Sequence, residues 1–295
     1  MCAAGSRCRV AAQPNRAELL NAPVPNPAHL PAHARARGEI RVSFDDTAGR
    51  TSVSRLHEAG GLRLRFPRPV DGCEAVLVNT GGGIAGGDAA RIRVTAGAGA
   101  EALLTTQSAE KIYRAQNAPA RVSLSLAAGA GARLEWLPQE TILFDGARLV
   151  RTLDLEADAR ARVTLLESTV FGRLAMGETR ISGLLADRWR LRRGGSLVFA
   201  EDLRLDGPIA DLLDRPACGA GARATALLVH LAPDAEAMLE PVRAALDGAA
   251  CQHGASAWNG VLAVRLLSPS PAAVRAAIVP LLATLRGRPA PRVWQ

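Results

Sequence analysis

The chain has 295 residues, with 36 basic and 28 acidic side chains and a formal net charge of +8. Its 48% hydrophobic and 22% charged residues are ordinary for a soluble globular protein, and no segment approaches the ~18 consecutive apolar residues of a membrane span. The five cysteines lack C-x-x-C spacing, so neither a zinc cage nor a disulfide framework is indicated. Scattered arginines and 3% aromatic residues disfavour a nucleic-acid surface. We therefore expect a cytoplasmic protein with no nucleic acid or membrane partner, whose net positive charge can steer an acidic protein partner.

The N-terminal segment, residues 1–37, is rich in proline and alanine, and we expect a flexible leader there. Between residues 38 and 206, apolar residues alternate with polar ones, which is the pattern of half-buried strands. The alternation is clearest in residues 40–44, 62–66, 92–94, 122–126, 149–155 and 189–191. No stretch of this region has a 3.6-residue apolar stripe. Residues 38–206 are therefore predicted to form a β-rich scaffold domain.

A pattern of small residues followed by a strand-like segment recurs within this region. Residues 96–107 begin with Ala-Gly-Ala-Gly-Ala, residues 128–139 begin with the same five letters, and residues 157–167 repeat the pattern more faintly. Repeated units that bury their faces against their neighbours predict stacked sheets or a short β-solenoid. The alternative is that an Ala- and Gly-rich composition produces similar turns by chance.

The C-terminal part, residues 207–295, has a different pattern and is predicted to be α+β and packed on the β domain. Residues 233–246 fit a helix that has proline and acidic residues in its first turn and glycine after its end. Residues 261–267 alternate as a strand. Residues 272–286 fit a second helix, which Gly287 closes. The fold class is thus mainly β, in stacked or helical sheets, with a smaller α+β part containing two helices.

Residues 79–88, Asn-Thr-Gly-Gly-Gly-Ile-Ala-Gly-Gly-Asp, form the densest glycine cluster in the chain. The spacing of Gly81, Gly83 and Gly86 formally satisfies the dinucleotide-binding fingerprint G-x-G-x-x-G. That motif works only when a helix follows, because the pyrophosphate sits on the helix N-terminus, and residues 88–95 look like a strand. A glycine turn at a sheet corner is the stronger prediction, and a dinucleotide-binding enzyme using the run from Gly81 to Gly87 is the alternative.

The only lysine and the only tyrosine of the chain lie two positions apart, at Lys111 and Tyr113. Elsewhere arginine supplies the basic side chains. A lysine that persists in such a chain indicates a position where arginine does not substitute for it, although chance placement explains it equally well.

Five motifs occur along the chain in order. They are G-G-x-x-G-G-D at residues 82–88, T-T-x-x-A-x-K-x-Y-R at 105–114, L-E-W-L-P-Q-E-T-I at 134–142, G-R-x-x-x-G-E at 172–178 and P-R-V-W at 291–294. Together they resemble the motifs of the UreD family of urease accessory proteins, also called UreH, over residues 38–295. The chain departs from the family at residues 107–108, where many members have Pro-Gly, and at residues 79–80, where His-Pro is common.

The resemblance implies a protein that is not an enzyme and holds no tightly bound cofactor. It implies a β-rich metallochaperone scaffold that joins UreF and the GTPase UreG on the urease apoprotein, in a hetero-oligomeric complex that inserts nickel. Hydrolysis of GTP then belongs to a partner, in agreement with the missing Gly-Lys-Ser/Thr of a P-loop. It also implies a structural or partner-facing role for the motif residues Gly82, Gly83, Gly86, Gly87, Asp88, Lys111, Tyr113 and Arg114.

A nickel(II) ion that only passes through needs ligands that hold it weakly, and carboxylates meet this need better than a Cys/His cage. Three carboxylates that lie in the family-like motifs or shortly after one, Glu140, Asp145 and Glu178, are the candidates for a transient nickel path. Each has a structural alternative. Glu140 fits a strand-end carboxylate paired with an arginine, and Asp145 and Glu178 fit turn-capping positions next to a glycine.

Overall fold

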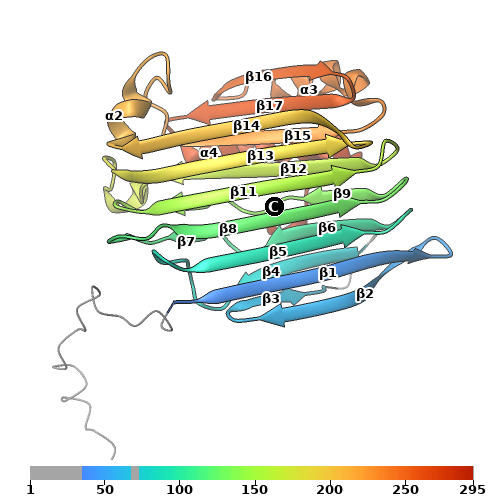
Figure 1. Ribbon diagram of the computed structural model, residues 1–295. Helices are drawn as coiled ribbons and strands as arrows, with labels where there is room; N and C mark the ends of the chain where they lie inside the picture. Colours follow the sequence, from blue (N-terminus) through green and yellow to red (C-terminus); the bar gives the residue numbers. More distant parts are fainter. Residues whose placement is uncertain (1–34, 68–72, 295) are drawn as a thin grey trace, which may run out of the picture. The chain divides into compact units, whose positions relative to one another are not determined.

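The computed structural model describes residues 35–67 and 73–294 (Figure 1). The predicted leader lies outside the described residues except for its last three. Residues from Arg35 onward belong to one compact unit. Two large sheets, here called sheet A and sheet B, make up most of it.

Sheet A has seven strands in the order β14-β13-β11-β8-β5-β1-β2. The five central strands, from β13 to β1, run parallel, and the hairpin partners β14 and β2 close the two ends antiparallel. Their bounds are β1 Arg37–Thr47, β2 Arg50–Ala59, β5 Ala89–Ala96, β8 Ala120–Ala128, β11 Arg148–Ala157, β13 Gly183–Arg193 and β14 Ser196–Gly207.

Sheet B has ten strands, of which eight follow the order β16-β17-β15-β12-β9-β6-β4-β3, while β10 joins β12 to the short β7. Their bounds are β3 Leu62–Arg65, β4 Cys73–Asn79, β6 Glu101–Thr106, β7 Glu110–Ile112, β9 Arg133–Trp136, β10 Thr141–Leu143, β12 Arg162–Phe171, β15 Ala224–Leu231, β16 Gln252–Trp258 and β17 Val261–Ser268.

Three stacked turns of small residues lead the chain from sheet A to sheet B, at residues 97–100, 129–132 and 158–161. The backbone N–H of Gly129 donates to the carbonyl of Ala96 at 2.8 Å, and that of Asp158 donates to the carbonyl of Ala128 at 2.8 Å. The second and third turns are thus each hydrogen-bonded to the residue that precedes the turn before. The strands that follow run parallel and in register across Glu101, Arg133 and Arg162. The predicted stacked, solenoid-like arrangement is confirmed, and the small residues are explained by the close stacking of the turns.

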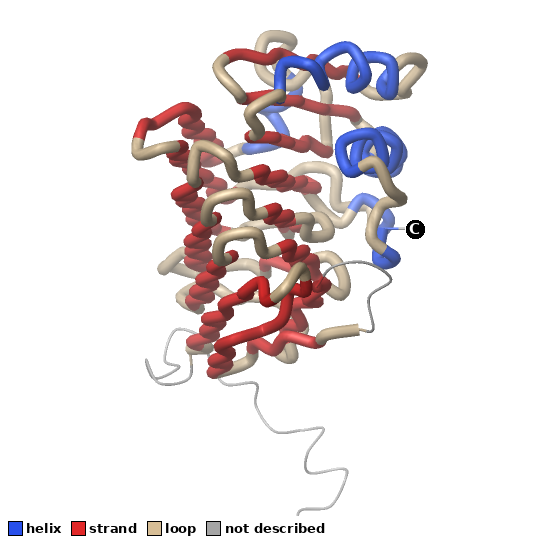
Figure 2. The backbone as a smooth tube through the Cα atoms, turned by 90° about the vertical axis from the view of Figure 1, so that its right-hand side faces the viewer, coloured by secondary structure: helices blue, strands red, loops and turns tan. Residues whose placement is uncertain are grey.

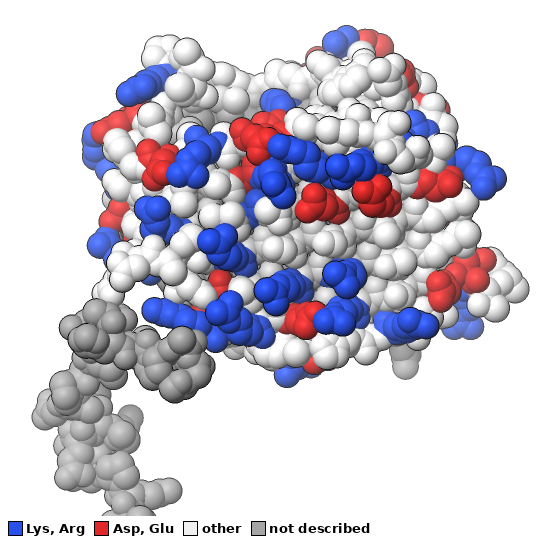
Figure 3. Space-filling view, in the orientation of Figure 1, with Lys and Arg blue, Asp and Glu red and all other residues white. Residues whose placement is uncertain are grey.

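The main core lies between the two sheets, and alternation in the sequence follows from this layering. In β5, for example, Ile92 and Val94 are buried while Arg91 and Arg93 are exposed. Figure 3 shows Lys and Arg side chains spread over the outer face of sheet A, with Asp and Glu among them. Strand β12 is buried along nearly its whole length, because helices cover the outer face of sheet B.

Helices α3 and α4, with the 3-10 turns η4 and η5, form a third layer beside sheet B (Figure 2), whereas α2 packs into the core between the sheets. The bounds of all helices and turns are α2 Ile209–Asp214, α3 Leu239–Leu246 and α4 Pro271–Arg286, with 3-10 turns η3 Leu174–Met176, η4 Ala235–Met238 and η5 Arg292–Trp294. Ser270 caps α4 by accepting from the N–H of Ala273, and Gly287 ends it in the left-handed conformation. The predicted second helix is confirmed, and the predicted first helix is η4 followed by α3.

Strands β15, β16 and β17 extend sheet B, so the C-terminal residues share a sheet with the solenoid. The predicted domain boundary after residue 206 stays a prediction. Among residues 35–67 and 73–294, no helix combines the length and apolarity that crossing a membrane requires.

Candidate functional site

The loops that return from sheet B to sheet A bring residues of three of the five motifs together along one edge, with the residues that follow the third motif. We call residues 80–88, 113–119, 144–147 and 172–182 the motif edge; these are the links β4–β5, β7–β8, β10–β11 and β12–β13. Because successive coils stack in register, residues about one repeat apart in the sequence come into contact here. The edge contains most of the residues that the sequence singled out.

The glycine run is packed tightly against the next coil. The hydroxyl of Tyr113 donates to the carbonyl of Gly82 at 2.8 Å. A Cβ placed on Gly83 would lie 2.4 Å from Cε2 of Tyr113, and one on Gly86 would lie 2.5 Å from the Cβ of Ala115. These two glycines are therefore required by close approach of neighbouring coils. The N–H of Gly87 donates to the carbonyl of Pro119 at 3.3 Å, which joins the same two loops.

Asp88 closes the glycine turn. It is buried, its Oδ2 accepts from the N–H of Ala85 at 2.8 Å, and its Oδ1 accepts from the N–H of Ala36 at 2.9 Å. Strand β5 begins at the next residue, Ala89. The run is thus a sheet-corner turn, as predicted, and the helix N-terminus that the dinucleotide fingerprint needs is replaced by a strand.

Asn79 stands at one of the points where the chain departs from the family pattern, and its side chain organises the turn. Its Oδ1 accepts from the N–H of Gly81 at 3.0 Å, and its Nδ2 donates to the carboxylate of Glu110 at 3.1 Å. Burial raises the pKa of Glu110, against the opposing effects of Asn79 and the charge of Lys111. Lys111 is exposed on β7, and its carbonyl accepts from the N–H of Ile84 at 2.8 Å.

Aromatic and cation–π contacts connect three successive loops of the motif edge, the links β7–β8, β10–β11 and β12–β13. The rings of Tyr113 and Phe144 meet edge to face with centroids 5.2 Å apart, and the guanidinium of Arg173 lies 4.5 Å from the centroid of Phe144. Arg173 in turn holds Glu178 with two side-chain hydrogen bonds of 3.0 and 2.9 Å. The Arg173 side chain, with further backbone donors that include Asp145, lowers the pKa of Glu178 to about 2.

The three candidate nickel carboxylates are each engaged by an arginine. Asp145 pairs with Arg114 and accepts from the N–H of Ser182 at 3.0 Å. The backbone of Asp145 contributes to the lowered pKa of Glu178. Glu140 directly precedes β10, and its Oε2 lies 3.4 Å from Nη1 of Arg275 in α4. Among the described residues, no three Asp, Glu, His or Cys side chains gather in a group that could hold a metal ion.

The fifth motif, at the C-terminus, closes over the third. The indole of Trp294 is buried and donates to the carbonyl of Leu137 at 3.0 Å. Gln139 donates to the carbonyl of Val293 at 2.8 Å, and Arg275 donates to the Gln139 side chain at 2.7 Å while its guanidinium lies 4.8 Å from the Trp294 ring. A cavity of about 130 Å³ beside them is lined by Glu140, Trp294 and α4 residues. The motif P-R-V-W thus joins α4 to the segment between β9 and β10 of sheet B.

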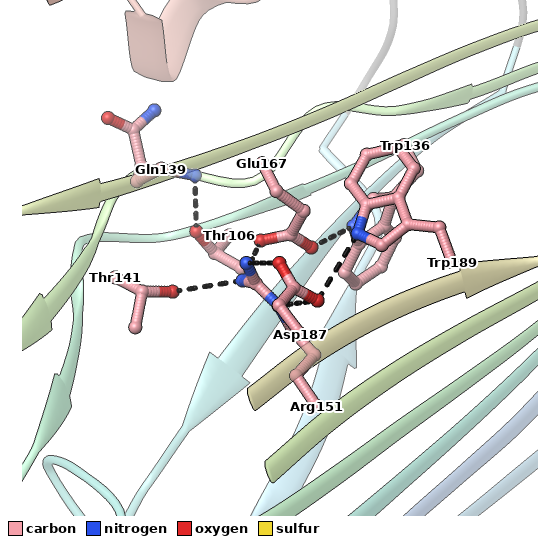
Figure 4. Close-up of polar contacts among 8 residues, drawn as sticks. All are labelled: Thr106, Trp136, Gln139, Thr141, Arg151, Glu167, Asp187 and Trp189. Atoms are coloured by element: carbon pink, nitrogen blue, oxygen red, sulfur yellow. Dashed lines mark hydrogen bonds and ion pairs between the residues drawn. The ribbon is translucent and has the colours of Figure 1, made fainter. Parts of the chain in front are cut away.

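A buried charged cluster between the sheets was missed by the sequence analysis (Figure 4). Arg151 on β11 makes ion pairs with Glu167 on β12 and Asp187 on β13. Trp136 donates to Glu167 at 2.9 Å and Trp189 donates to Asp187 at 3.2 Å. Burial raises the pKa of Glu167, although Arg151 opposes this. The sequence contained an indication of a buried charge, because the alternation in residues 149–155 places Arg151 on the same inward face as the apolar residues.

The comparisons with known proteins agree with this arrangement of motifs. Residues 36–295 match the family described as UreD urease accessory protein. The chain is 49% identical over 260 residues to the urease accessory protein UreD of Xanthobacter autotrophicus, covering 88% of this chain and 90% of that one. It is 46% identical over 269 residues to the UreD of Azorhizobium caulinodans, covering 90% and 99% of the two chains. It is also 50% identical over 262 residues to the UreD of Beijerinckia indica, covering 88% and 97%. The chain therefore belongs to the UreD family of urease accessory proteins.

Proposed function

We propose that the protein is a non-catalytic scaffold in the maturation of urease, and that it acts with UreF and the GTPase UreG on apo-urease during nickel insertion. Family membership supports the urease role. The observation that carries the scaffold role is the motif edge. Its glycines, aromatic rings and ion pairs contact one another between neighbouring coils. Groups that pack coils together in this way are typical of a rigid scaffold, whereas a substrate pocket needs polar groups directed into a cavity.

Nickel is the cargo in this proposal, and Glu140, Asp145 and Glu178 remain the proposed ligands of its path. Each carboxylate has an arginine neighbour, Arg275, Arg114 and Arg173 respectively. A passing divalent cation would have to compete with a guanidinium at every step. Such competition keeps binding weak and release easy, as a conduit requires.

The scaffold proposal is tested by co-purification of the full chain with UreF, UreG and apo-urease, followed by nickel-dependent activation of urease. We expect a complex with these proteins, and activation that depends on the protein. Absence of any complex would refute the partner assignment. Equal activation without the protein would refute the maturation role.

The nickel path is tested with the combined substitutions Glu140→Ala, Asp145→Ala and Glu178→Ala. A matched control changes three carboxylates that are also paired with arginines but lie outside the motifs, Glu156, Asp202 and Glu240. We expect loss of activation only in the first variant, at equal protein levels and with the complex still formed. Full activation by that variant would remove these residues from the path.

A further inference from the structure

Four neighbouring strands of sheet A, β2, β1, β5 and β8, point a group of exposed arginines outward. The five, which we call the basic face, are Arg41 on β1, Arg55 on β2, Arg91 and Arg93 on β5, and Arg121 on β8. The other outward charged side chains of these strands are Arg37, Glu39, Asp45, Arg50 and His57. Figure 3 shows positive side chains gathered over this part of the sheet, with few negative ones among them. Positive charge therefore predominates here.

The strand register places like charges beside one another on the basic face. Arg41 on β1 is directly opposite Arg93 on β5, and Arg91 lies two positions before Arg93 on the same side of the strand. On β8 the positions opposite Arg91 and Arg93 are Ser123 and Ser125, which carry no charge. Neighbouring strands lie about 4.8 Å apart, and like charges at neighbouring positions on one face repel each other. The stability of the sheet does not account for this arrangement.

One carboxylate, Glu39, lies within the basic face. Nε of Arg41 donates to it at 2.6 Å. This hydrogen bond, together with the charges of Arg41, His57 and Arg91, lowers the pKa of Glu39. Asp45 lies beyond the end of the β1–β5 pairing. In the described part of the chain, the other four arginines of the basic face form no ion pair with a carboxylate. Their charge is therefore left for a partner to neutralise.

The other half of the same outer face is neutralised within the chain. Arg190 on β13 pairs with Asp202 on β14, and Arg188 stands opposite the same aspartate in the strand register. Arg192 on β13 lies 3.4 Å from Glu156 on β11. Arginines in this half are thus matched by carboxylates on neighbouring strands. The uncompensated charge of the basic face is a local feature and does not simply follow from the arginine-rich composition.

The chemistry of the basic face favours a protein surface as its occupant. The outward residues between the arginines are small, and include Ser43, Thr95, Ser123 and Ser125. None of the outward side chains of β1, β5 and β8 is aromatic, whereas single-stranded nucleic acid binds by stacking its bases on aromatic rings. Guanidinium groups bind carboxylates through paired hydrogen bonds. Figure 2 shows the helices of the described residues away from this face, so an extended acidic surface can reach it.

We propose that the basic face docks against an acidic surface of apo-urease. This inference rests on the proposed function and names the surface through which it operates. Urease is the protein that the family description names, and an open sheet face suits an extended protein surface rather than a small ligand. Attraction between opposite charges acts before contact, so it mainly raises the association rate, and salt weakens it.

The test measures the association rate of the full chain with purified apo-urease from the same organism. The variant with Arg91→Gln, Arg93→Gln and Arg121→Gln is expected to associate about tenfold more slowly at about 0.1 M ionic strength, where the Debye length is about 10 Å. The difference is expected to disappear at about 1 M, where that length is about 3 Å. Lysine at the same three positions keeps the charge and is expected to retain the rate within about threefold.

A matched control removes the same charge elsewhere. It carries Arg160→Gln, Arg215→Gln and Arg243→Gln, three exposed arginines outside sheet A. Its net charge equals that of the first variant, and its association rate is expected to stay within about twofold of the wild-type rate, because distant charges are screened. Substitutions of exposed arginines change stability little, so both variants are expected to fold, and thermal unfolding verifies this.

An unchanged association rate in the first variant would overturn the proposal. An equal loss in the control would also overturn it, because net charge and not the basic face would then be responsible. If the first variant lost binding only to UreF, to UreG or to single-stranded DNA, the face would have another occupant and the proposal would be wrong. If the wild-type chain did not bind apo-urease at either ionic strength, the proposed function would fail as well, whereas binding that ignores the basic face would remove this inference alone.

Discussion

The buried cluster around Arg151 allows the sharpest test of the fold. In Arg151→Met, Glu167 and Asp187 lose their guanidinium and each keeps one indole donor, from Trp136 and Trp189. Removing one partner of a buried ion pair typically costs about 3–5 kcal/mol, because the remaining charge is left uncompensated. We expect the free energy of unfolding to fall by about that amount at pH 7.

Protonation of Glu167 limits the loss of free energy of unfolding in Arg151→Met and makes that loss depend on pH. Burial already raises the pKa of Glu167 and Arg151 opposes this, so without Arg151 the folded-state pKa of Glu167 rises further above its unfolded value. The folded variant then binds more protons than the unfolded chain, so its stability falls as pH rises through and above the unfolded pKa. Protonating an ordinary Glu carboxyl costs about 4 kcal/mol at pH 7 and about 2 kcal/mol at pH 5.5. The loss in Arg151→Met is therefore expected to shrink by about 2 kcal/mol between pH 7 and pH 5.5.

The assay is urea unfolding followed by tryptophan fluorescence at the two pH values. The control is Arg162→Met, which removes an exposed ion pair with Asp234 and is expected to cost ~0–1 kcal/mol. Adding Glu167→Gln and Asp187→Asn to Arg151→Met removes the charges but keeps acceptors for the indoles, and is expected to restore part of the stability. A loss no larger than that of the control, or a loss that grows as the pH is lowered, would refute the reasoning.

Three further outcomes are expected. Trp294→Ala removes a buried indole with its hydrogen bond and cation–π contact, and is expected to lower the free energy of unfolding by about 3–5 kcal/mol. Trp258→Ala, at a 38% exposed site, is expected to lower it clearly less. Equal losses in the two variants would contradict the role given to the C-terminal motif. Tyr113→Phe loses only the hydroxyl bond to the glycine run, about 1 kcal/mol, and a value above about 3 would show that the ring had also moved. Arg173 lowers the pKa of Glu178 to about 2. The ionised carboxylate therefore stabilises the folded state above the unfolded pKa, and this contribution is lost as pH falls toward 2. Glu178→Gln is expected to flatten the acid side of the profile of Tm against pH, and an unchanged profile would contradict the Arg173–Glu178 pairing.

Local patterns in the sequence predicted many of the strands, the two longer helices and the stacking of the coils, but not the short helix α2. The alternation around Ile92 and Val94 predicts a strand with one buried face, because side chains of a strand point to opposite sides. The small-residue turns at 96–100 and 128–132 predict stacked coils, since only small residues allow backbones to approach that closely. Ser270 and Gly287 mark the two ends of α4 for reasons of local hydrogen bonding and backbone conformation.

The interactions of the motif residues were decided by tertiary structure. Tyr113 covers Gly83, and Arg173 stacks on Phe144, because the coils place residues from separate repeats in register. Sequence alone showed Glu178 as a carboxylate in a motif, without its ion pair to Arg173. Nor did it show that Arg151, on an otherwise apolar inward face, meets two acidic residues from neighbouring strands. Strands, turns and family motifs can be predicted because they depend on residues that are neighbours in the sequence. The packing of coils and the pairing of charges depend on contacts between distant segments, which exist only in the folded chain.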